Sequence, residues 1–144
     1  MIINIQVKQM GKKGRHIKPL ALEYATRPET AQQLIEETVR MMVADFIRRQ
    51  QEAKEGRIPE ALSEENMQNM AAVGKIAFGE IYNDKEPDAE KAVQTAWQAY
   101  ADGIVRLFVN GTEAEYSENG TGLALQEGDE ITFVRLAMLA GRLF

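Results

Sequence analysis

The sequence contains no cysteine and a single histidine, His16. Without a thiol the chain cannot form a cysteine nucleophile, a disulfide, a cysteine-bound zinc site or an iron–sulfur cluster. A Ser-His-Asp triad would have to use His16, which follows the Gly11–Gly14 stretch in a basic segment typical of a solvated turn. We therefore expect no catalytic site built on these residues, no metal and no cofactor.

Long apolar runs are absent as well. No segment approaches the roughly 18 consecutive apolar residues that a transmembrane helix needs. The first eight residues alternate between apolar and polar side chains, whereas a signal peptide has a positively charged start followed by an apolar run. These patterns predict a chain that does not associate with membranes and is located in the cytoplasm.

The chain has the length and composition of one soluble domain. It has 144 residues, of which 44% are hydrophobic and 27% charged, so it can bury a core without covalent staples. The net charge of −5 is unevenly distributed, because the first twenty residues carry lysine and arginine but no acid. Acidic residues outnumber basic ones over residues 28–91, which predicts a dipolar molecule.

The first 25 residues are expected to form a β-hairpin. Apolar side chains alternate with polar ones along two stretches: Ile3, Ile5 and Val7, then Leu20, Leu22 and Tyr24. Between them, Gly11-Lys12-Lys13-Gly14 has the composition of a turn, because glycine tolerates positive φ angles.

Two helices with clear start signals are predicted in the middle of the chain, and Ser63 could cap a further short helix between them. Thr30 and Gln33 have the spacing of a capping box, and apolar residues then recur every three or four positions to about residue 54. Asp88 is placed to cap a second helix, and Gly103 to end it. Residues 55–62 contain Gly56 and Pro59 and are expected to form a loop.

The period of two returns near the C-terminus. We expect a strand over 104–109, a turn at Asn110-Gly111, a return strand over 114–116 and a last strand over 131–138. Because a long crossover separates the first and last strands, they can pair in parallel. The pattern favours an α+β domain in which one mixed sheet carries the long helix.

This arrangement resembles the β-grasp, or ubiquitin-like, fold. Residues 1–12 are similar to the first strand and turn of ubiquitin, 20–30 to its second strand and helix cap, 105–112 to its third strand, and 128–135 to its last strand. The closing part also resembles the bacterial sulfur carriers for thiamine and molybdopterin, and the ending resembles that of a small uncharacterised bacterial family. The resemblance implies a β-grasp core over 1–54 and 103–144 with a helical insertion over 55–102.

The C-terminus departs from the pattern of those carriers. Ubiquitin-like modifiers and sulfur carriers end in Gly-Gly, whose carboxylate is activated, whereas here a single Gly141 is followed by Arg142. A carrier or modifier that acts through its C-terminus therefore stands as an alternative function, which would require trimming of the chain to Gly141.

Two groups of residues are candidates for partner binding. The basic hairpin tip holds Lys12, Lys13 and Arg15, and the C-terminus holds Arg142, Leu143 and Phe144. The tip would attract an acidic protein partner, and the exposed apolar end would anchor it. A nucleic-acid contact is an alternative for the tip, but no aromatic side chain is interleaved there for base stacking, so nucleic acid is the less favoured partner.

The sequence does not predict an enzyme. The acids in pairs such as Glu36 and Glu37 are adjacent on a helix and do not face each other, so they do not form an acid–base pair. We expect a noncovalent adaptor or accessory subunit with a bacterial protein partner. An enzyme would instead require a pocket with convergent polar groups between the insertion and the sheet.

Overall fold

The computed structural model describes residues 1–9, 19–56 and 88–136. These ranges contain two helices, α1 (Ala31–Lys54) and α3 (Ala89–Ala101). They also contain five strands: β1 (Ile2–Gln9), β2 (Leu20–Glu23), β3 (Val105–Val109), β4 (Thr112–Glu113) and β5 (Glu130–Arg135). The predicted α+β class is confirmed. No helix among the described residues is long and apolar enough to cross a membrane.

The five strands form one mixed sheet in the order β2-β1-β5-β3-β4. β1 pairs antiparallel with β2, as predicted for the hairpin, and parallel with β5, as predicted for the first and last strands. β3 pairs antiparallel with β5 on one side and with β4 on the other. The strands farthest apart in the sequence are therefore neighbours at the centre of the sheet.

Helix α1 begins where the sequence predicts, but its cap differs in one bond. The Thr30 side chain accepts a hydrogen bond from the Gln33 N–H at 3.1 Å. The Gln33 side chain accepts the N–H of Glu29 at 2.8 Å, whereas a capping box would return to Thr30 itself. Thr30, which the Gln33 side chain leaves unbonded in favour of Glu29, has an extended conformation and forms a β-bridge with Gly122 before the helix starts.

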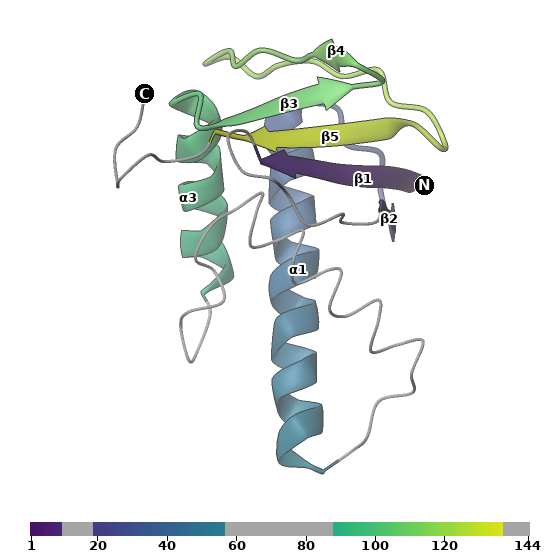
Figure 1. The fold of residues 1–144 in the computed structure, drawn as a ribbon, viewed down its shortest axis with the longest axis vertical. Helices are drawn as coiled ribbons and strands as arrows, with labels where there is room; N and C mark the ends of the chain where they lie inside the picture. Colours follow the sequence, from purple (N-terminus) through teal and green to yellow (C-terminus); the bar gives the residue numbers. More distant parts are fainter. Residues whose placement is uncertain (10–18, 57–87, 137–144) are drawn as a thin grey trace.

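The core lies between the helices and one face of the sheet. Figure 1 shows both helices on the same side, with α1 passing behind β3, β5 and β1. Side chains from every layer are buried there, including Ile3, Ile5, Leu22, Leu107, Ile131 and Phe133 from the sheet, Leu34, Ile35, Val39 and Met42 from α1, and Ala92, Val93 and Ala96 from α3. Met42 is completely buried in this core.

The C-terminal hairpin ends earlier than predicted. The return strand is Thr112–Glu113, and the predicted strand over 114–116 is wrong. Ala114 still donates its N–H to the Leu107 carbonyl at 2.8 Å, but its own carbonyl accepts the Tyr100 hydroxyl at 2.6 Å. Because the Tyr100 hydroxyl takes the Ala114 carbonyl, this carbonyl does not continue the antiparallel pairing with β3. β5 ends at Arg135, and residue 138, where the strand was predicted to end, lies outside the described residues.

Gly103 ends α3 in the predicted way, with a φ of +75° just after the Asp102 cap. A Cβ added there would meet nothing within 4 Å, so a substitution is opposed only by the backbone conformation. We expect Gly103→Ala to lower the free energy of unfolding by about 1 kcal/mol in urea titrations. Gly122→Ala is the matched control, because its surroundings are equally open and its φ is not positive. Equal losses in the two variants would contradict this explanation.

Candidate protein-interaction surface

The two surfaces predicted from the sequence lie outside the described residues. They comprise Lys12, Lys13 and Arg15 of the hairpin tip and Arg142, Leu143 and Phe144 of the C-terminus. Gly141, on which the carrier alternative depends, and most of the 55–102 insertion also lie outside them. These interpretations stay predictions.

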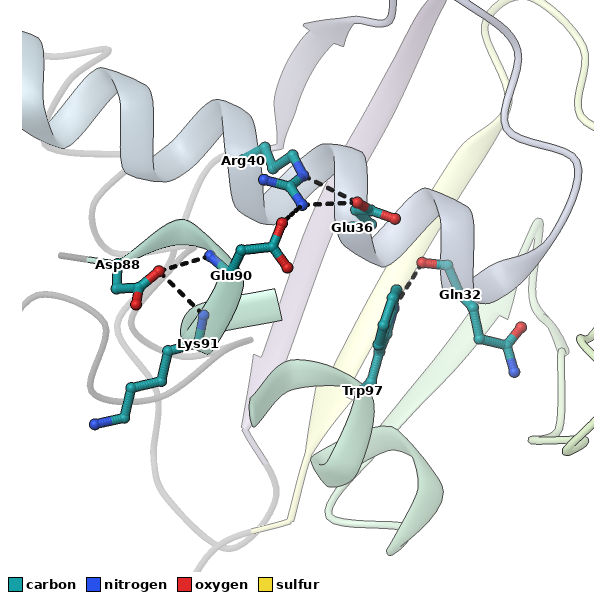
Figure 2. A network of polar contacts seen from close by, with 7 residues as sticks. All are labelled: Gln32, Glu36, Arg40, Asp88, Glu90, Lys91 and Trp97. Carbon is teal, nitrogen blue, oxygen red and sulfur yellow. Dashed lines mark hydrogen bonds and ion pairs between the residues drawn. The ribbon is translucent and has the colours of Figure 1, made fainter. Parts of the chain in front are cut away.

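Charged groups form an exposed network that bridges the two helices. Arg40 of α1 pairs with Glu36 one turn earlier at 2.9 Å and with Glu90 of α3, as Figure 2 shows. The hydrogen bond with Glu90, followed by that with Glu36, raises the pKa of the Arg40 guanidinium. Asp88 accepts the N–H groups of Glu90 and Lys91 and so caps α3 as predicted. The ion pairs are solvent-exposed, and such pairs contribute little to stability.

Trp97 of α3 joins this helix to α1, and the side chains of Gln32 and Tyr100 bind the loop over residues 114–121. The Trp97 indole donates to the backbone carbonyl of Gln32 at 2.9 Å (Figure 2), and the Gln32 side chain accepts the N–H of Thr121 and donates to the Ser117 carbonyl, both at 3.0 Å. The Tyr100 ring is buried. Both aromatic side chains of α3 therefore serve packing and hydrogen bonding within the domain.

A polar pair lies inside the otherwise apolar core. The hydroxyl of Tyr24 lies 2.6 Å from that of Thr38, and Thr38 also donates to the Leu34 carbonyl at 2.6 Å. Both side chains are buried, and burial is the main cause that raises the pKa of Tyr24 above its ordinary value. The one available signal was the position of Thr38 on the apolar stripe of α1, one turn from both Leu34 and Met42. The pair is enclosed and therefore structural.

Metal binding finds no support within the described ranges. There, no three side chains of His, Cys, Asp or Glu gather closely enough to hold a metal ion.

The second face of the sheet carries neither described helix. We call it the open face. Register and strand alternation place on it Ile2, Asn4, Gln6 and Lys8 of β1, Ala21 and Glu23 of β2, Arg106 and Phe108 of β3, Glu113 of β4, and Glu130, Thr132 and Val134 of β5. In the view of Figure 1 this face is turned toward the reader, because α1 lies behind the strands.

The open face combines apolar side chains with charges of opposite sign. Pairing between the strands puts Gln6, Thr132 and Phe108 in one row across the sheet, and Lys8, Val134 and Arg106 in the next. Phe108 and Val134 are only half-buried there. Two basic side chains therefore flank an apolar one at this end of the face.

The other end of the open face is acidic. Glu130 precedes Val134 on β5 by four residues, which is about 13 Å along a strand. Glu23 lies beside Ile2, whose side chain is 43% exposed. Arg106 has a distant partner in Glu113, at 4.0 Å, and both of these side chains are accessible to solvent. The face thus has a basic end and an acidic end, and its central row holds Phe108 with one acid, Glu113, beside it on the edge strand β4.

No protein family, curated protein or solved structure matches this chain. A functional argument therefore depends on the surfaces of the molecule itself.

Proposed function

We propose that this protein is a non-enzymatic interaction module, an adaptor or accessory subunit, that binds a protein noncovalently through the open face. One observation carries the proposal: both described helices cover the same face of the sheet, while the second face keeps Phe108, Val134 and Ile2 accessible or half-buried. A sheet that has one covered face is already stable, so apolar residues on the second face are not needed for the core. Protein interfaces typically place such residues centrally and charged ones at the rim.

The charges of the open face indicate the chemistry of the surface that would bind to it. The contact surface of the partner would place carboxylates over Lys8 and Arg106 and an apolar side chain over Phe108. The predicted basic tip continues this pattern in sequence, since Lys12 follows Lys8 by four residues. Such complementarity accelerates association and weakens with added salt. The expected cytoplasmic location and bacterial partner belong to the same proposal.

We also infer that the fold is of the β-grasp type. The supporting features are a hairpin followed by a long helix, and a sheet in which the parallel strands β1 and β5 lie side by side within the order β2-β1-β5-β3-β4. The resemblance implies no activity for this chain, because one fold serves many unrelated functions.

The proposal is tested by photocrosslinking in the native host. We expect p-benzoylphenylalanine in place of Phe108 to give a crosslinked protein adduct, and the same probe in place of Gln94, exposed on α3, to give none. The adduct should be lost when Lys8→Glu and Arg106→Glu are added, because the basic end would then repel its partner. The absence of an adduct at position 108, or equal adducts at 108 and 94, would contradict the proposal.

A further inference from the structure

The tripeptide Asn-Gly-Thr occurs twice in the chain, at residues 110–112 and at residues 119–121. Asparagine followed by glycine is the pair most prone to spontaneous deamidation, because glycine has no side chain to shield its backbone nitrogen. We infer that Asn119 is a site of this modification in the folded protein and that Asn110 is protected from it. The inference goes beyond the proposed function, since it concerns the loop after β4 and not the open face.

The reaction needs only the chain and solvent water. The backbone nitrogen of Gly120 attacks the side-chain carbonyl carbon, Cγ, of Asn119. The bond from this carbon to Nδ2 breaks, and ammonia leaves with the proton of the Gly120 N–H. Water then opens the cyclic imide at either of its two carbonyl groups. One product is aspartate, and the other is isoaspartate, in which the main chain runs through Cβ and Cγ and is longer by one bond.

Two hydrogen bonds hold Asn110 away from this reaction. Its Oδ1 accepts the N–H of Glu130 at 2.9 Å, and its own N–H donates to the Glu130 carbonyl at 2.8 Å. Asn110 also has a φ of +48° in the turn between the paired residues Val109 and Thr112. Its Cγ reaches the Gly111 nitrogen only if the side chain leaves β5 and the turn opens at the end of the sheet.

Asn119 is held much less firmly. Its side chain is exposed, and within the described ranges no hydrogen bond restrains it. The attacking N–H of Gly120 donates to the Ser117 carbonyl at 3.0 Å, and this turn bond must open before the ring closes. Hydrogen bonds in exposed loops open at a much lower free energy than those that join strands of a sheet. Ring closure at Asn119 is therefore the easier of the two.

The position of Asn119 gives the modification a structural effect. The side chain of Gln32 donates to the Ser117 carbonyl and accepts the Thr121 N–H, so Asn119 lies at the centre of a stretch that is fixed at both ends. The Thr121 carbonyl also accepts the N–H of Ala31, the first residue of α1, at 2.8 Å. An isoaspartate at position 119 lengthens the chain between these anchors, and we expect it to weaken the bonds to Gln32.

Peptide mapping by mass spectrometry tests the inference with an internal control. The folded protein is incubated at mildly alkaline pH in water enriched in oxygen-18, in which deamidation adds about 3 Da, compared with about 1 Da in ordinary water. Cleavage after Glu113 and Glu118 separates the two asparagines. Asn119 should gain this mass at least about tenfold faster than Asn110, because reaction at Asn110 must also break its bonds to Glu130. In guanidinium chloride, which unfolds both tripeptides, the two rates should converge.

Two variants at position 119 separate the reaction from its effect. Asn119→Gln should lose the fast mass gain, because the longer side chain would have to close a larger ring, and it should fold normally because the position is exposed. Asn119→Asp carries the added charge on an unaltered main chain. The isoaspartate form, isolated by ion exchange, should unfold at a lower denaturant concentration than Asn119→Asp, because only isoaspartate lengthens the chain between the bonds to Gln32.

Three results would overturn the inference. The first is equal rates at the two positions in the folded protein, or a faster reaction at Asn110. The second is a folded protein in which neither position gains mass during the time that both react in guanidinium chloride. The third, which would overturn the structural effect, is an isoaspartate form as stable as Asn119→Asp. The crosslink at position 108 does not depend on any of these results, so the proposed function is tested separately.

Discussion

Phe133→Ala is expected to reduce the free energy of unfolding by about 3–5 kcal/mol. Phe133 lies on β5 with Val7 of β1 and Leu107 of β3 as its register neighbours, and its side chain is completely buried. Truncation would remove the apolar contacts of the ring and leave a cavity that the strands on both sides cannot close. Because domains are stable by only about 5–15 kcal/mol, much of the native population would be lost near physiological temperature.

Phe108→Ala is the matched control for this prediction. It removes the same side chain from the neighbouring strand, but on the open face, where the ring is half-buried. Urea titrations at low protein concentration should show a clearly smaller loss than for Phe133→Ala. Equal losses would mean that both faces of the sheet belong to a core, which contradicts the open face on which the proposed function depends.

Above pH 10 the protein is expected to lose stability because of the buried Tyr24. Burial raises the pKa of this tyrosine above its ordinary value of 10.0, whereas in the unfolded chain the group ionises normally. Above pH 10 the unfolded state therefore binds fewer protons than the native state, and the free energy of unfolding falls as pH rises. The contribution of one such group is about 1.4 kcal/mol per pH unit, or about 2 kcal/mol between pH 10 and 12.

Tyr24→Phe isolates this effect. At neutral pH the variant should lose about 1 kcal/mol, because the hydrogen bond to Thr38 disappears while Thr38 still donates to the Leu34 carbonyl. Between pH 10 and 12 its stability should fall by about 2 kcal/mol less than that of the wild type. Some alkaline loss should persist, because burial also raises the pKa of Tyr100. Tyr116→Phe, with a side chain 43% exposed, should follow the wild-type pH dependence; a parallel loss in Tyr24→Phe and the wild type would refute the assignment.

The sequence predicts those parts of the fold that depend on local signals. The bounds of α1 follow from the Thr30 cap and the apolar stripe, and the parallel pairing of β1 with β5 follows from the long connection between them. The end of β4 does not, because it depends on the Tyr100 hydroxyl, which comes from another element and takes the Ala114 carbonyl.

The open face could not be predicted in this way. Lys8, Arg106 and Glu130 come from three strands and become neighbours only through the pairing register. The available signal was strand alternation. Phe108 and Val134 are apolar, although their neighbours in the strand are the residues that face the core. β3 and β5 therefore each carry an apolar side chain on both faces of the sheet. Clusters that are contiguous in the chain, such as Lys12, Lys13 and Arg15, can be recognised without a register, but these residues lie outside the described ones.

The parallel pairing of β1 with β5 has a consequence for biosynthesis. β1 is synthesised long before its central neighbour, which begins at Glu130. At about 5–20 residues per second, synthesis from residue 9 to residue 130 takes roughly 6–24 s, which is far longer than the microseconds in which a hairpin forms. Through this interval the nascent β1–β2 hairpin exposes an unpaired edge at Ile5 and Val7. The strand that completes the sheet is inserted between segments already made, so the centre of the sheet is the last part to be completed.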